Sequence, residues 1–156
     1  MKDFQEYQEI ESLIAQACND FDEYHKYLIA KDNINLHLND YGFVSFEDAI
    51  MSCKQYYYMS KLIVFPEKTV IVDCGCCAGI QQVFFNKCKK YIGIDILNNF
   101  QKISSNAEFI YGDMKKVLKN IDTDKFYTIG ISNLCCSYFE DTMPIFKEKF
   151  NKLISL

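Results

Sequence analysis

The chain has 156 residues, 49% of them hydrophobic and 24% charged, which is enough apolar material for one compact domain with its own core. Its longest apolar runs are far too short to span a membrane, and its N-terminus lacks the apolar segment of a signal peptide, so we expect a cytoplasmic protein with no membrane partner. Arginine is absent, the net charge is −4, and residues 1–60 are strongly acidic, so a dedicated nucleic-acid-binding function is not favoured.

Residues 1–156 are predicted to form a single domain, in which residues 1–60 make a mostly helical N-terminal extension or lid. Acid pairs at capping-box spacing, followed by apolar residues at helical spacing, indicate two helices within residues 3–29. Residues 33–39 alternate strictly between polar and apolar side chains, which favours a short strand. A third helix is predicted over residues 45–60.

In the core, residues 61–156, strand patterns alternate with helical patterns. A helix is predicted over residues 79–88 and a final one over residues 141–154, where Pro144 is tolerated because it falls in the first turn. Strands that are apolar on both faces and separated by helices form a parallel sheet with right-handed crossovers, so the predicted fold class is α/β. The four predicted strands are residues 69–73, 91–95, 108–111 and 126–131.

The chain holds eight cysteines but only two histidines. The cysteines lack the paired spacing of a zinc site, and nothing indicates an oxidising compartment, so we expect neither a structural metal nor a disulfide framework. Most of them are predicted to be small buried hydrophobic residues. They are Cys18, Cys53, Cys74, Cys76, Cys77, Cys88, Cys135 and Cys136.

The most informative segment is the glycine-containing turn that follows the first strand of the core, Val-Asp-Cys-Gly-Cys-Cys-Ala-Gly over residues 72–79. Glycines allow the backbone to bend sharply there and allow a ligand to approach closely. The spacing does not fit the GxGxxG fingerprint of dinucleotide-binding proteins. In addition, Asp73 directly precedes the turn, and its carboxylate would repel a pyrophosphate but would suit a cationic group.

The pattern Asp73-x-Gly75-x-Cys77-x-Gly79 resembles the DxGxGxG loop of class I methyltransferases that depend on S-adenosylmethionine (SAM). Cys77 stands where the family's middle glycine would be. The acid suits the amino group or the sulfonium region of SAM. The resemblance implies a Rossmann-like parallel sheet with strand order 3-2-1-4 and SAM as the cofactor.

The resemblance also assigns residues at the ends of the next two strands to the cofactor. Asp95, followed by Ile96, lies where the family binds both ribose hydroxyls with one carboxylate. Asp113 lies where the family holds the adenine amino group, and its apolar neighbour Met114 would pack on the ring. An acid at a strand end is often only a helix cap, so the prediction depends on all three acids meeting at one place.

After the fourth predicted strand, Asn133 is the only residue left of the [DNS]PP[YF] pattern found in amino-methylating relatives. It could line the methyl-transfer site, or it could cap a helix, and the sequence leaves both open. Cys135 and Cys136 have no histidine near them in sequence to act as a base, so buried packing is favoured over a nucleophilic role. No catalytic residue is assigned.

The family core normally has seven strands, and strands five to seven are expected to be missing here. The fourth strand, residues 126–131, would then be an exposed apolar edge, which proteins normally cover. We therefore expect a second copy of the chain, a partner protein or residues 34–38 to cover it.

Two functions follow from the resemblance. The first is a SAM-dependent methyltransferase with an unknown acceptor, and the second is a SAM-binding regulatory or scaffolding subunit without chemistry of its own. A nicotinamide or nucleotide binder of the dinucleotide type is disfavoured by the spacing of the glycine turn.

Overall fold

The computed structural model of the protein describes residues 55–132, 136–150 and 152–155. Within them, residues 55–61 are helical, in agreement with the end of the third predicted helix. The other predictions for the N-terminal extension lie outside the described residues, and the boundary between extension and core remains a prediction. None of the helices among the described residues has the length and apolar character needed to cross a bilayer.

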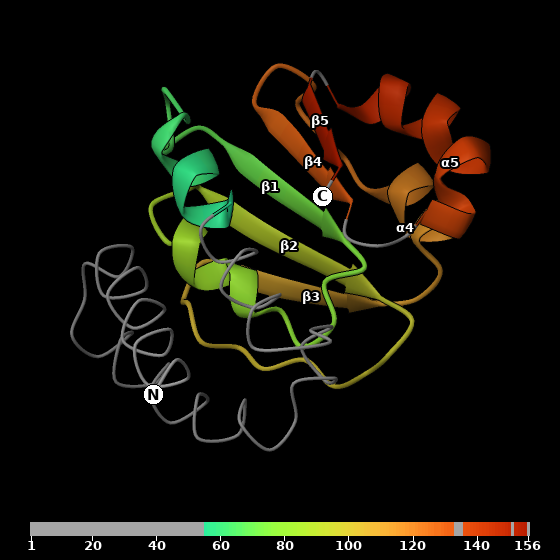
Figure 1. Ribbon diagram of the computed structural model, residues 1–156, viewed down its shortest axis with the longest axis horizontal. Coiled ribbons are helices and arrows are strands. Elements are labelled where there is room, and N and C mark those ends of the chain that lie inside the picture. Colours follow the sequence, from blue (N-terminus) through green and yellow to red (C-terminus); the bar gives the residue numbers. More distant parts are fainter. Residues whose placement is uncertain (1–54, 133–135, 151, 156) are drawn as a thin grey trace, which may run out of the picture.

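The fold is α/β and Rossmann-like, as the sequence predicts. Figure 1 shows its five parallel strands in the order β3-β2-β1-β4-β5. Runs of Val, Ile and Tyr form these strands because their side chains suit a pleated surface that is buried on both faces. The strands are β1 (Val70–Cys74), β2 (Lys90–Asp95), β3 (Ala107–Tyr111), β4 (Thr128–Ser132) and β5 (Lys152–Ser155).

The C-terminal segment differs from the prediction. The final helix, α5, spans Cys136–Lys149, and the chain then forms β5, which pairs in parallel with β4 from Ile129 to Ser132. The prediction that strand five is missing is therefore wrong, and β4 is not the exposed edge that a partner subunit was expected to cover. The four residues of β5 are too few to show a strand pattern of their own, and their apolar spacing is that of a helix. Pairing with the apolar strand β4 outweighs this local preference.

Two helices also differ from their predicted form. Pro144 lies inside α5 rather than in its first turn, so the helix lacks one of its backbone hydrogen bonds there. The helix expected over residues 79–88 is a six-residue 3-10 helix, η2 (Ile80–Phe85). The carbonyl of Gly79 accepts a hydrogen bond from the backbone amide of Gln82 at 3.3 Å, with the i to i+3 spacing of a 3-10 helix, and a second one from the Gln82 side chain at 2.7 Å.

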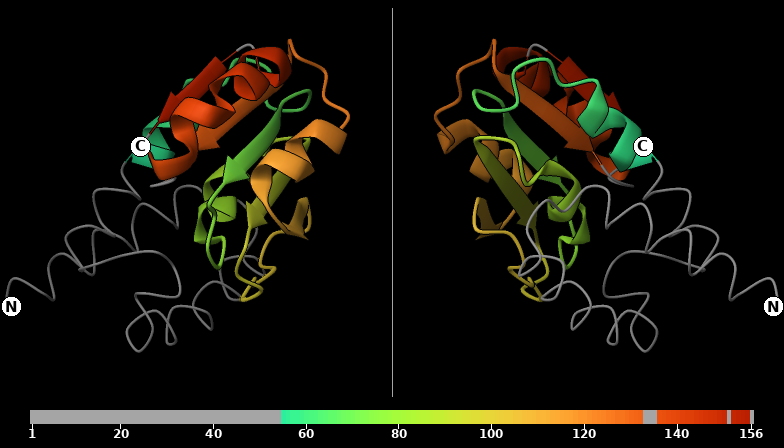
Figure 2. Two further views of the ribbon diagram at one scale, coloured as in Figure 1. Left: turned by 90° about the vertical axis from the view of Figure 1, so that its right-hand side faces the viewer. Right: turned by 90° about the vertical axis from the view of Figure 1, so that its left-hand side faces the viewer.

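The two faces of the sheet are covered differently, as Figure 2 shows from two sides. On one, which we call the α face, α4 (Met114–Asn120) and α5 pack over strand residues that alternate with those of the other face. On the other, the turn face, η2 and helix 55–61 pack together, with Tyr56 against Phe84 and Phe85. The buried cluster of the α face is Val72, Cys74, Ile92, Ile94, Met114, Leu118, Phe146 and Phe150.

Candidate functional site

The glycine turn leaves β1 through residues with left-handed backbone conformations. Gly75 has φ 76°, Cys77 has φ 50° and Gly79 has φ 79°. At Gly79 the reason for glycine is visible, because an added Cβ would lie 2.3 Å from the ring of Phe109. The turn thus rests directly on an aromatic side chain from β3, and Cys77 holds a conformation that L-residues rarely adopt.

Four amide groups of the turn already have backbone or side-chain acceptors. Those of Gly75 and Cys76 donate to the carbonyl of Ile94 at 2.8 and 3.3 Å, and that of Gly79 donates to the carbonyl of Cys76 at 2.9 Å. The amide of Cys77 donates to a carboxylate oxygen of Asp95 at 2.7 Å. Turns of this kind bind anions through unoccupied amides. Here the anion is the protein's own Asp95, so these amides are not presented to a pyrophosphate.

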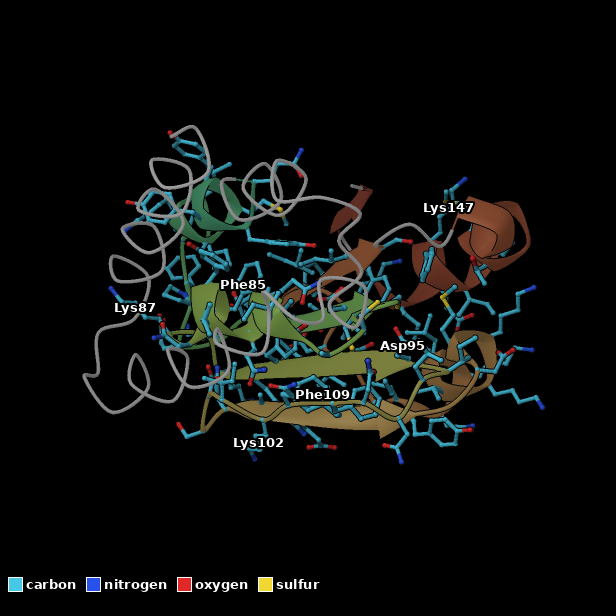
Figure 3. The ribbon with its side chains drawn as sticks, turned by 60° about the horizontal axis from the view of Figure 1, so that its bottom comes forward. Phe85, Lys87, Asp95, Lys102, Phe109 and Lys147 are labelled. Atoms are coloured by element: carbon cyan, nitrogen blue, oxygen red, sulfur yellow. The ribbon has the colours of Figure 1, made fainter. Side chains whose placement is uncertain are left out.

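Asp95 is the central acid of the site. Figure 3 shows it at the carboxyl end of β2. Its Oδ2 accepts the hydrogen bond from Cys77, its Oδ1 accepts one from the amide of Leu97 at 2.9 Å, and the residue is 8% exposed. A carboxylate has about four acceptor positions, so each oxygen retains the capacity for a further hydrogen bond. Asp95 therefore joins two backbone segments while keeping the capacity to bind a pair of hydroxyl groups.

Asp73 lies beneath the turn rather than at the surface. It is 0% exposed, and its Oδ2 accepts a hydrogen bond from the Tyr91 hydroxyl at 2.5 Å. Burial, together with the neighbouring Asp73 carboxylate, raises the pKa of Tyr91 well above its usual value. The Cys76 thiol lies near both acids, and burial followed by the charges of Asp73 and Asp95 raises its pKa strongly. The structure thus brings Asp73 and Asp95 together around Cys76.

Asp113 has a different environment. It is exposed and caps α4, because its Oδ1 accepts hydrogen bonds from the amides of Lys115 at 2.8 Å and Lys116 at 3.2 Å. Met114 is packed in the buried cluster of the α face. The ends of β2 and β3 are nevertheless tied together, since the amide of Gly112 donates to the carbonyl of Asp95 at 2.9 Å. Asp113 is therefore near this end of the sheet but has a capping role of its own.

Three large side chains that are next to Asp95 in the chain or in the sheet register are exposed. Ile96 is 62% exposed and Leu97 is 54% exposed. Tyr111, 64% exposed, is the partner of Asp95 in the pairing of β2 with β3. Sequence reasoning named only Ile96. Tyr111 becomes a candidate only through the register of β2 with β3, which the sequence alone does not give. We call this region, formed by residues 74–79, 95–97 and 111–113, the carboxyl edge.

The remaining predictions concern the cysteines and Asn133. Cys74, Cys76 and Cys88 are buried, as predicted, and Cys77 is half-buried. Burial raises the pKa of Cys88 to about 12. Among the described residues, no group of three or more His, Cys, Asp or Glu side chains is arranged to hold a metal ion. Asn133 and Cys135 lie outside the described residues.

Neither a scan against protein-family models nor a search of curated proteins gives a match to this sequence. The function is therefore argued from the chemistry of the carboxyl edge. That edge combines a carboxylate able to accept hydroxyl groups, exposed large side chains at neighbouring positions, and amides that are already occupied. These features suit a ligand with vicinal hydroxyls and a flat apolar ring, and they do not suit a phosphate.

Proposed function

We propose that the protein binds SAM at the carboxyl edge and uses it as a methyl donor. The observation that carries this proposal is the position of the Asp95 carboxylate, held against the glycine turn by the Cys77 amide. Charge-assisted hydrogen bonds from both ribose hydroxyls to one carboxylate are geometrically specific, and Asp95 has the acceptor capacity for them. The resemblance of the turn to that of class I methyltransferases supports the same assignment.

The electrostatics of the edge favour a cationic nucleoside over a dinucleotide. Asp73 and Asp95 both lie close to Cys76, and their charges help to raise the pKa of its thiol. The same negative potential favours the sulfonium and amino groups of SAM and disfavours a pyrophosphate. Moreover, η2 is a short 3-10 helix, so it offers little of the positive field that a longer helix provides.

The other residues receive roles that follow from their placement. Ile96 and Tyr111 are exposed beside Asp95 and would contact the adenine ring. Asp113 would reach the adenine amino group with carboxylate capacity that its capping bonds leave over. Asp73 would act through its charge and through Tyr91, since it has no exposed surface with which to touch a ligand.

Methyl transfer itself requires alignment of the donor carbon with an acceptor nucleophile, and much of the rate can come from that proximity. No general base is assigned. Two roles remain open for Asn133, which could line the methyl-transfer site or cap a helix. The acceptor is not identified by the described residues. A SAM-binding subunit without chemistry is the alternative, and formation of S-adenosylhomocysteine (SAH) from SAM with any acceptor distinguishes the two.

The first test is thermal unfolding of the protein with SAM, SAH or NAD. A ligand at 100 times its Kd stabilises the folded state by about 2.7 kcal/mol, which corresponds to about 5–11 °C for a chain of this size. We expect this shift with SAM and SAH and none with NAD. In Asp95→Ala, the shift relative to the variant's own midpoint should largely disappear.

A matched control is Glu67→Ala, because Glu67 is an exposed acid that precedes β1 at the opposite end of the sheet. Its ligand-induced shift should equal that of the wild type. A shift with NAD but not with SAM, or an undiminished SAM shift in Asp95→Ala, would refute the proposed site.

A further inference from the structure

The connection between β2 and β3, residues 96–106, is an irregular loop, although connections of this kind are usually helices. A helix satisfies its own backbone hydrogen bonds, whereas a loop must find partners elsewhere or face water. This loop is not fully exposed, because Ile103 is 4% exposed and Ser104 is 2% exposed. Its buried amides therefore need acceptors from another part of the chain.

A single side chain on η2 supplies them. Gln82 is 0% exposed, and its Oε1 accepts hydrogen bonds from the amides of Ile103 at 2.8 Å and Ser104 at 2.9 Å. Its Nε2 donates to the carbonyl of Gln101 at 2.7 Å and to the carbonyl of Gly79 at 2.7 Å. Both N–H groups and both lone pairs of the amide are thus in use.

These four bonds connect the loop to the end of the glycine turn. Two more contacts connect the same elements, since the amide of Gln101 donates to the carbonyl of Ala78 at 3.1 Å and the Ser104 hydroxyl lies 3.4 Å from the carbonyl of Gln82. At its other end the loop is held by Asp95, whose Oδ1 accepts a hydrogen bond from the amide of Leu97. The loop and the turn are therefore fastened at both ends.

We propose that Gln82 is a positioning residue that fixes the loop 96–106 against the glycine turn and so presets the carboxyl edge for its ligand. The inference rests on the proposed function, since it concerns the same ligand. Gln82 does not touch the ligand itself. Its bonds hold the loop that carries Ile96 and Leu97, so that little ordering of the backbone remains to be done on binding.

The chemistry of the amide makes substitution informative. Gln82→Met has nearly the same volume but leaves the amides of Ile103 and Ser104 without an acceptor. Gln82→Glu keeps the shape and the acceptor oxygen but cannot donate to the two carbonyls. A matched control is Gln81→Met, because Gln81 is 3% exposed on the same helix but its Nε2 reaches the Tyr56 hydroxyl, at 3.4 Å, rather than the loop.

The experiment combines amide hydrogen exchange, resolved by residue, with SAH titration by calorimetry. In Gln82→Met, the amides of Ile103 and Ser104 should exchange about tenfold faster or more relative to the amides of β1, as loss of a buried hydrogen bond requires. In Gln82→Glu they should also exchange faster, because a carboxylate cannot donate to the carbonyls of Gln101 and Gly79 and repels them. The Kd for SAH should rise by a similar factor. Gln81→Met should leave both quantities within about threefold of the wild type.

Faster loop exchange with an unchanged Kd would overturn the proposal, because the loop would then not form part of the ligand site. Unchanged exchange would overturn it as well. If neither Gln82 variant folds, the wild-type protein decides, since SAH must slow exchange at Ile103 and Ser104. Absence of SAH binding by the wild type would instead refute the proposed function, and the exchange rates alone would then show whether Gln82 fixes the loop.

Discussion

The two faces of this sheet are built by the same strands but bury different kinds of side chain. On the α face, β1 and β2 contribute Val72, Cys74, Ile92 and Ile94, and apolar side chains of α4 and α5 pack against them. On the turn face, the alternate residues of the same strands include Asp73 and Tyr91, and η2 adds Gln82, all of them buried. The residues that β1 and β2 place on the α face are thus apolar, whereas those on the turn face include polar groups that are buried and hydrogen-bonded.

The difference concerns what the buried groups on each face do. A buried polar group costs free energy unless it is hydrogen-bonded, and replacing a bonded pair by apolar side chains is often neutral for stability. Under α4 and α5, β1 and β2 contribute an apolar cluster. The polar groups of the turn face instead hold the turn and the loop that form the carboxyl edge. The two faces should therefore respond differently to substitution.

The largest effect is expected on the α face. Phe146→Ala removes a buried ring that packs against Phe150 with 5.7 Å between ring centroids. We expect the free energy of unfolding to fall by about 3–5 kcal/mol, measured by urea denaturation. Lys147→Ala, at the exposed neighbouring position labelled in Figure 3, should change it by less than about 0.5 kcal/mol.

If the faces are functionally distinct, folded Phe146→Ala should bind SAH with the Kd of the wild type. A Kd raised about tenfold under conditions where the variant is folded would show that the α face also shapes the ligand site, and the contrast between the faces would be lost.

On the turn face, Tyr91→Phe should lower the free energy of unfolding by about 1–3 kcal/mol at neutral pH. The substitution keeps the ring stacked on Phe85 but removes the hydroxyl that donates to the buried Asp73 carboxylate. Urea denaturation measures this effect. A variant as stable as the wild type would show that Asp73 does not depend on Tyr91.

The same variant should alter the response to alkaline pH. The folded-state pKa values of Tyr91, Cys76 and Cys88 are all raised, that of Cys88 to about 12 from a usual value of 9.0. Above the unfolded-state values the unfolded chain releases protons that the folded one retains, so stability is lost as pH rises beyond about 9. Each group contributes up to about 1.4 kcal/mol per pH unit, and Tyr91→Phe should remove the contribution that begins near pH 10.

The fold was predictable from sequence because its signals are local and repeated. The first four strands are β-branched or aromatic runs, and their ends fall within two residues of the predicted ones. β5 was missed because Lys152–Ser155 continues a helical spacing and becomes a strand only by pairing with β4. The 3-10 form of η2 is not visible in the sequence, because the spacing of its apolar residues does not distinguish a short 3-10 helix from an α-helix.

The placement of Asp73 and Asp95 at one edge of the sheet was predictable from sequence, but the environment of each carboxylate was not. A parallel sheet brings the ends of β1 and β2 to one edge, so Asp73 and Asp95 were expected to lie close together. Both are buried, and their hydrogen-bond partners cannot be read from the sequence spacing. The Tyr91 hydroxyl donates to Asp73, and the amides of Cys77 and Leu97 donate to Asp95. Gln82 has no signal in the sequence at all, because its role arises from a loop brought near it by the fold.

The smallest expected effect concerns the backbone strain at Cys77 in the glycine turn. Cys77 has φ 50°, where an L-residue costs about 1–2 kcal/mol and glycine does not, while glycine loses about 0.5–1 kcal/mol more in backbone entropy on folding. Cys77→Gly should therefore raise the free energy of unfolding by no more than about 1 kcal/mol in urea denaturation. Cys77→Ser keeps the Cβ and should gain nothing. A loss of stability in Cys77→Gly would show that contacts of the Cys77 side chain outweigh the strain of its backbone, which would make this cysteine a structural element of the turn rather than a tolerated substitute for glycine.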